Sequence, residues 1–100
     1  MKKLATRKYE TMFIVRPELD EAQQTALIER FSGVITAGGG EVLKVDRWGK
    51  RRLSYEIEKV REGYYVVIKF TGDAGLEKEL TRVFKITDGI MRSIVIREED

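Results

Sequence analysis

The sequence contains neither cysteine nor histidine. The absence of cysteine excludes disulfides, a thiolate nucleophile and a cysteine-ligated metal. The absence of histidine removes the commonest metal ligand and the commonest general base. Catalysis would have to use carboxylates, lysines or tyrosines, and the acids gather mainly on the solvent faces of predicted helices. We therefore predict that the chain is not an enzyme and that it holds no catalytic residue, metal, cofactor or small-molecule substrate.

Long apolar runs are also missing. No stretch approaches the ~20 residues that a membrane-spanning helix needs. The N-terminal segment 1–8 is basic but has no apolar segment after it, which argues against a signal peptide. We expect a cytoplasmic protein without membrane contact. Its length of 100 residues predicts one domain over residues 1–100, with residues 1–6 and 98–100 as flexible ends.

The apolar pattern predicts strands and helices in the order strand, helix, strand, strand, helix, strand. Asp20 and Gln23 have the spacing of a capping box at the start of the first helix. The three glycines at 38–40 follow this helix, so we interpret them as a C-cap and turn rather than as a phosphate loop. Residues 60–63 are expected to form a short turn. The predicted strands are 8–15, 41–59, 64–71 and 90–97, and the predicted helices are 21–37 and 76–87.

This order is typical of the α+β ferredoxin-like split βαβ fold, a four-stranded antiparallel sheet with two helices on one face. Right-handed crossovers place strands 8–15 and 64–71 in the centre. Both of these strands carry apolar residues on both faces, as central strands do. Gly49 interrupts the strand 41–59 and indicates a bulge.

Basic residues gather at two places. The start of the first strand should lie beside the end of the last one, which predicts a basic corner of Arg7, Lys8, Arg92 and Arg97. Cations also follow one another on the second strand, where they could contact phosphate or guard a sheet edge against aggregation. The candidate phosphate-binding residues are Arg7, Lys8, Lys50, Arg51, Arg52, Arg92 and Arg97.

Arg51 and Arg52 should have different roles, because neighbouring strand residues point to opposite faces. We expect one of them to face solvent or phosphate. The other should pack its stem over the sheet near Trp48. On the same strand, Leu53, Tyr55 and Ile57 are expected to anchor the chain to the core.

The sheet face without helices is predicted to be apolar. If Phe13 and Val66 lie under the helices, residues such as Ile14 face the other way; the reversed assignment would also leave an apolar patch. An exposed patch of this kind usually has a partner, with Tyr65 as the main anchor. The candidate partner-binding residues are Met12, Ile14, Trp48, Tyr65 and Val67.

Stacking of RNA bases on the central strands, as RRM domains do, is not supported. The RRM consensus on its third strand requires aromatic side chains at spaced positions. The corresponding stretch, from Glu62 to Lys69, departs from that consensus at the first, fourth, fifth and final positions.

Another resemblance covers nearly the whole chain. The longest matching stretch has the pattern G-x-R-R-L-x-Y-x-I-x-K, with G-x-Y shortly after it. The stretches that carry it are Lys8-Tyr9-Glu10, Arg16-Pro17-Glu18-Leu19-Asp20, residues 49–59, Glu62-Gly63-Tyr64-Tyr65 and Asp88-Gly89-Ile90-Met91-Arg92. In these stretches the sequence resembles the bacterial small-subunit ribosomal protein six family. The segment before Arg7 is a few residues longer than the family pattern, and Ser54 stands where alanine is frequent.

The resemblance implies a structural protein of the ribosome in the cytoplasm. Members of the family bind the central domain of small-subunit ribosomal RNA together with small-subunit protein eighteen, as a heterodimer. On this basis the candidate cations would face ribosomal RNA and the apolar patch would face protein eighteen. The alternative is an effector-binding or oligomerising regulatory module on the same fold, which co-sedimentation with small subunits would distinguish.

Overall fold

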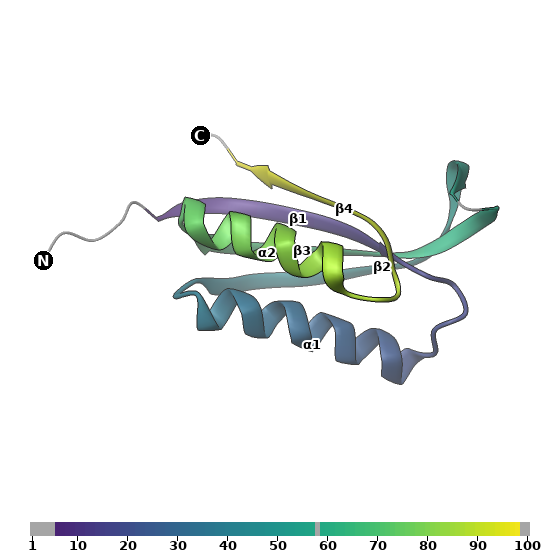
Figure 1. The fold of residues 1–100 in the computed structure, drawn as a ribbon, viewed down its shortest axis with the longest axis horizontal. Coiled ribbons are helices and arrows are strands. Elements are labelled where there is room, and N and C mark those ends of the chain that lie inside the picture. The colour runs from purple at the N-terminus through teal and green to yellow at the C-terminus, as the bar shows by residue number, and fades with distance from the viewer. Residues whose placement is uncertain (1–5, 58, 99–100) are drawn as a thin grey trace, which may run out of the picture.

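The structure is a computed structural model that describes residues 6–57 and 59–98 (Figure 1). The sheet is antiparallel with the strand order β2-β3-β1-β4. Both helices lie on one side of it (Figure 1). The predicted ferredoxin-like split βαβ fold is therefore confirmed, with β1 and β3 in the centre. The elements are β1 (Arg7–Val15), α1 (Glu21–Ala37), β2 (Glu41–Ile57), β3 (Val60–Gly72), α2 (Ala74–Ile86) and β4 (Ile90–Arg97).

The ends of α1 follow from its capping residues. The backbone N–H of Gln23 donates to Asp20 Oδ1 at 2.8 Å, and the N–H of Asp20 donates to Gln23 Oε1 at 2.9 Å. These two bonds form the predicted capping box and satisfy donors that a helix start leaves free. At the other end Gly38 is the C-cap and Gly39 has φ +84°, a conformation that favours glycine.

The core lies between the sheet and the helices. Phe13 of β1 contacts Phe31 of α1 edge-on, with ring centroids 5.1 Å apart, and Phe31 contacts Phe84 of α2 at 4.2 Å. Val66 and Ile68 of β3 are buried in the same cluster. The predicted inward faces of β1 and β3 are therefore confirmed.

The hairpin between β2 and β3 differs from the prediction. The sequence predicts a turn at 60–63, but these residues are already in β3, and Lys59 has φ +68° just before it. Gly63 serves close packing rather than a turn, because a Cβ at this position would collide with the side chain of Ile14. The predicted bulge is confirmed, since Gly49 has φ +86° where the β2–β3 register shifts.

The predicted flexible ends fall mostly on residues 1–5 and 99–100, outside the described residues. Glu98 is described, and its backbone N–H donates to the carbonyl of Lys8 at 2.9 Å. This bond continues the β1–β4 ladder by one residue.

Candidate RNA and protein interface

The start of β1 and the end of β4 form one basic corner. Tyr9 pairs with Arg97, and both Arg7 and Lys8 are exposed beside it. Burial raises the pKa of the Tyr9 phenol, and Glu77 raises it further, whereas Arg97 and Arg7 act in the opposite direction. The pairing of Tyr9 with Arg97 and the bond from the Glu98 N–H to the Lys8 carbonyl bring the start of β1 and the end of β4 together. The prediction that Arg7 and Lys8 lie near Arg97 is confirmed.

Arg92 does not belong to this corner. It pairs with Ile14, near the far end of β1. It lies five positions before Arg97, a separation of about 16 Å along a strand. The predicted grouping of Arg92 with the basic corner is therefore wrong; its guanidinium carbon instead lies 5.0 Å from the centre of the Tyr55 ring.

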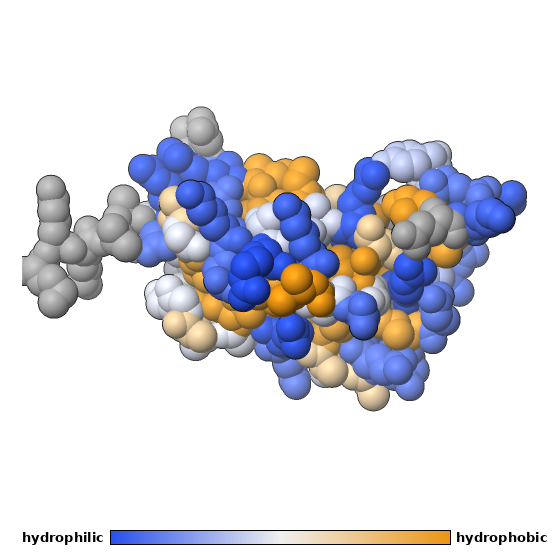
Figure 2. Space-filling view, viewed as in Figure 1, coloured by the Kyte–Doolittle hydropathy of each residue, from blue (hydrophilic) through white to orange (hydrophobic). Residues whose placement is uncertain are grey.

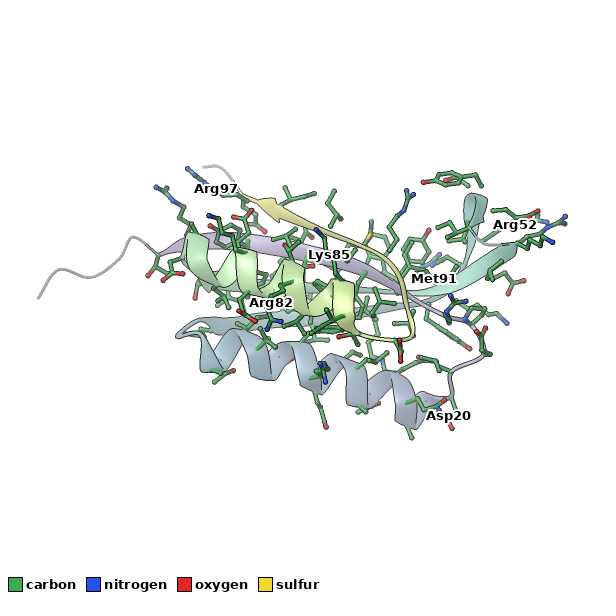
Figure 3. The ribbon with its side chains drawn as sticks, in the orientation of Figure 1. Asp20, Arg52, Arg82, Lys85, Met91 and Arg97 are labelled. Atoms are coloured by element: carbon green, nitrogen blue, oxygen red, sulfur yellow. The ribbon has the colours of Figure 1, made fainter. Side chains whose placement is uncertain are left out.

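A second group of cations lies on the β2–β3 hairpin. Figure 3 shows Arg52 at one end of the molecule and Arg97 at the other. Lys50 Nζ lies 3.1 Å from Glu62 Oε2, and this hydrogen bond raises the pKa of Lys50. Within the described part of the chain, neither Arg51 nor Arg52 forms an ion pair. These two exposed arginines thus leave their donors to an external anion.

An aromatic pair lies beside these arginines. The rings of Trp48 and Tyr65 stack with centroids 6.3 Å apart and an interplanar angle of 5°. They line a shallow depression together with Arg51 and Arg52. Both arginines therefore border the same depression, and the different roles expected of them stay a prediction.

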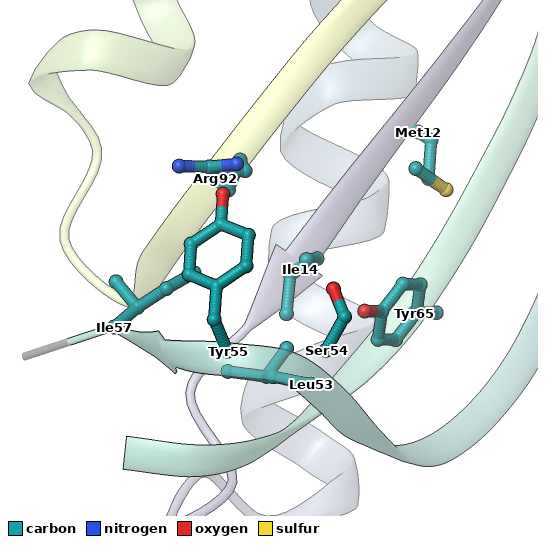
Figure 4. Close-up of a pocket in the computed structure, with 8 residues that line it drawn as sticks. All are labelled: Met12, Ile14, Leu53, Ser54, Tyr55, Ile57, Tyr65 and Arg92. Carbon is teal, nitrogen blue, oxygen red and sulfur yellow. The ribbon is translucent and has the colours of Figure 1, made fainter. Parts of the chain in front are cut away.

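The end of β2 covers part of the helix-free face. Residues 53–57 run past the ends of β1 and β4, and we call this segment the β2 arm (Figure 4). Leu53 of the arm is 9 % exposed. The pairing of β2 with β3 is irregular between Arg52 and Ile57, which frees the arm to turn onto this face. The sequence predicts that this segment anchors the chain to the core. In the structure it packs instead on the helix-free face, away from the core between the sheet and the helices.

The arm changes the exposure of the predicted apolar patch. Ile14 is 5 % exposed and Val67 is 4 % exposed, so the chain itself buries both. The expectation that these two side chains lie open to a partner is wrong for this conformation. Met12 and Tyr65 remain half-buried. Trp48 is 46 % exposed, so the Trp48–Tyr65 pair is an accessible aromatic feature of this face.

A model of the protein family Ribosomal protein S6 matches residues 8–97. The chain belongs to the ribosomal protein S6 family. The match covers both helices and every strand residue except Arg7. The resemblance found in the sequence is thereby confirmed.

Individual relatives agree with the S6 family model. The chain is 60 % identical over 93 residues to the small ribosomal subunit protein bS6 of Clostridium perfringens, covering 93 % of this chain and 98 % of that protein. It is 55 % identical to bS6 of Carboxydothermus hydrogenoformans, covering 93 % and 97 %. The crystal structure of 30S ribosomal protein S6 from Thermotoga maritima superposes with a TM-score of 0.88 at 37 % identity, over 94 % of this chain and 89 % of that chain.

Membership of the S6 family bears on the predicted absence of catalysis. The relatives are named as ribosomal proteins, and the chain is not an enzyme. Among residues 6–57 and 59–98, no group of three or more acidic side chains is placed to hold a metal ion. No helix in the described part is long and apolar enough to cross a membrane.

Sequence reasoning missed several residues of this S6-family surface. Tyr55, which lies under Arg92, was assigned to the core because it alternates with Leu53. Ile94 and Ile96 on the edge strand β4 were not selected, although they are 47 % and 50 % exposed. Their alternation with Ser93 and Val95 was the available signal, since alternate residues of a strand share a face.

Proposed function

We propose that this chain is a structural constituent of the small ribosomal subunit. In this role it binds the central domain of small-subunit ribosomal RNA together with small-subunit protein eighteen. Membership of the S6 family supports the ribosomal part of the proposal. The central domain and protein eighteen follow from the family resemblance described above.

The observation that carries the proposal is the Trp48–Tyr65 stack beside Arg51 and Arg52. The residues that contribute most to binding at protein interfaces are enriched in tryptophan, tyrosine and arginine, the three residue types found here. The half-buried Met12 lies beyond Tyr65 in the pocket at the β2 arm (Figure 4). We therefore assign protein eighteen to the Trp48–Tyr65 end of the helix-free face.

Ribosomal RNA would take exposed cations at both ends of the molecule. Phosphate contacts need accessible cations rather than a particular base-reading geometry. Arg7, Lys8 and Arg97 supply them at one end of the molecule, and Arg52 supplies one at the other. These ends are separated along a longest dimension of 50 Å, so one RNA would have to extend along the protein, or two RNA segments would meet it.

Titration with protein eighteen in the absence of RNA tests the docking surface. We expect Trp48→Ala and Tyr65→Ala each to weaken binding by about 30-fold, since an anchor residue is typically worth about 2 kcal/mol. Ile86→Ala is the matched control, because Ile86 is 61 % exposed on α2. If both aromatic variants fold and bind protein eighteen as tightly as this control, the docking surface lies elsewhere.

The RNA part needs its own measurement. The complex of the chain with protein eighteen should bind an isolated central-domain RNA more tightly than an RNA of equal length from another domain. Equal affinity for both RNAs would contradict the assignment to the central domain. Co-sedimentation of the chain with small subunits in a cell extract would separately test its place in the ribosome.

A further inference from the structure

The edge strand β4 presents both apolar side chains and free backbone groups. It pairs only with β1 in the described sheet. Ile94 and Ile96 are about half exposed on its helix-free face. Figure 2 shows a hydrophobic area where β4 runs in Figure 1. Such an edge is a template for pairing with another strand.

The hydrogen bonds of β4 show which backbone groups remain available. The N–H of Glu98 donates to the carbonyl of Lys8, and the carbonyl of Ile94 accepts from Thr11 Oγ1 at 2.9 Å. The backbone groups of these even-numbered residues therefore point toward β1. Because backbone direction alternates along a strand, the N–H and C=O of Ser93, Val95 and Arg97 point away from the sheet.

We propose that β4 pairs antiparallel with β4 of a second copy of this chain, with the two-fold axis at Val95. In this register Val95 exchanges both backbone hydrogen bonds with Val95 of the second copy. Ile94 then lies opposite the second copy's Ile96, and Arg92 lies opposite its Glu98. These are non-hydrogen-bonded pairs, in which side chains approach most closely. The axis is perpendicular to the sheet, so the helices of both copies stay on one side.

Charge and hydrophobicity select this register over its neighbours. With the axis at Ile94, Arg92 would lie opposite Ile96 of the second copy, and Glu98 would lie opposite Ile90 of that copy. With the axis at Ile96, Glu98 would lie opposite Ile94 of the second copy. Only the axis at Val95 sets apolar against apolar and cation against anion, twice each by symmetry, and such cross-strand pairs stabilise a sheet.

Glu98 is available for this pairing. Its carboxylate lies 4.0 Å from Lys69 Nζ, and both side chains are more than a third exposed, so the existing ion pair is weak. Arg92 is also exposed, although its guanidinium lies over the Tyr55 ring. A single added strand pair makes a small interface, so the dimer should be weak and concentration-dependent.

Sedimentation of the full chain over a range of concentrations tests the proposal. We expect a reversible monomer–dimer equilibrium. Arg92→Glu and Glu98→Arg should each weaken dimerisation about tenfold or more, because like charges then face each other twice. The combined variant, with both substitutions, should restore it. Arg97→Glu is the control, since it makes the same charge change on the same strand but faces Ser93. A chain that stays monomeric at every concentration, or a combined variant no better than the single ones, would overturn the proposal.

Because the chain has no cysteine, one introduced thiol can report the register. Val95 lies on the proposed axis, where the two Cα atoms would be about 5.5 Å apart, within the range for a disulfide. Val95→Cys should therefore form a disulfide dimer on mild oxidation. Ser93→Cys should not, because its two copies would be about 13 Å apart. Equal or greater cross-linking of the Ser93 variant would contradict the register.

Discussion

The guanidinium carbon of Arg92 lies 5.0 Å from the centre of the Tyr55 ring. Arg92 is on β4 and Tyr55 is on β2, and these strands are the two edges of the sheet. The contact therefore joins opposite edges across the helix-free face (Figure 4). Arg92 and Tyr55 also line the same pocket as Ile14, and we infer that their contact helps to hold the β2 arm over this side chain.

Removing the Tyr55 ring should loosen the β2 arm. Tyr55 is 53 % exposed, and a cation over an exposed ring contributes about 0.5–1 kcal/mol. We expect Tyr55→Ala to lower the free energy of unfolding by about this amount and to speed amide exchange in residues 53–57. Tyr55→Phe keeps the ring and should exchange like the parent chain. Equal exchange rates in the Ala and Phe variants would show that Arg92 does not hold the arm.

Stability should fall at alkaline pH through Tyr9. Burial and then Glu77 raise its pKa above the ordinary value of 10.0. A raised pKa means that the folded state keeps its proton longer than the unfolded state, so this contribution is complete below about pH 10. It is lost as the pH rises from there through the folded-state pKa. Tyr9→Phe should therefore flatten the alkaline decline measured by urea unfolding. If the free energy of unfolding of this variant falls as steeply with pH as that of the parent chain, Tyr9 is not the cause of the alkaline decline.

Two glycines should respond oppositely to alanine. Gly33 lies inside α1, where an added Cβ meets nothing within 4 Å, so Gly33→Ala should stabilise the chain by about 0.5–1 kcal/mol. At Gly40 an added Cβ would collide with the carbonyl of Thr71 and with Leu76. Because backbone cannot move aside cheaply, Gly40→Ala should destabilise. Thermal unfolding of both variants measures the difference, and a shift of the same sign in both would contradict it.

The parts of the fold that local patterns determine could be predicted from the sequence. Asp20 and Gln23 fix the start of α1 through two short-range hydrogen bonds. The two apolar faces of β1 identify it as a central strand, and the structure places Phe13 and Ile14 on opposite faces. In both cases the sequence pattern lies within the same few residues as the helix start or strand that it predicts.

The β2 arm could not be predicted in this way. Alternation shows that Leu53 and Tyr55 share a face of the strand. It does not show whether this face packs on the core between the sheet and the helices or on the helix-free face. The shift in pairing between Arg52 and Ile57 decides between these surfaces, and that shift depends on contacts with β1 and β4. The misplacement of Arg92 was avoidable, because its distance from Arg97 follows from the rise per residue of a strand.

The last prediction concerns RNA, and it separates the two groups of cations. If both groups contact phosphate, neutralising either one should flatten the dependence of log affinity on log salt by about one to two units. We expect this for the pair Lys8→Ala with Arg97→Ala and for the pair Arg51→Ala with Arg52→Ala. The measurement is binding of central-domain RNA to the complex with protein eighteen, across a series of salt concentrations.

Lys78→Ala with Lys85→Ala is the matched control for this series. Both lysines are exposed on α2, and their removal changes the net charge by the same amount as each test pair. Its salt slope should equal that of the parent chain. Arg51 and Arg52 also line the depression beside Trp48, so their variant is first titrated with protein eighteen alone. A normal protein affinity with a reduced salt slope assigns these arginines to RNA, whereas a reduced protein affinity with an unchanged slope assigns them to the protein interface.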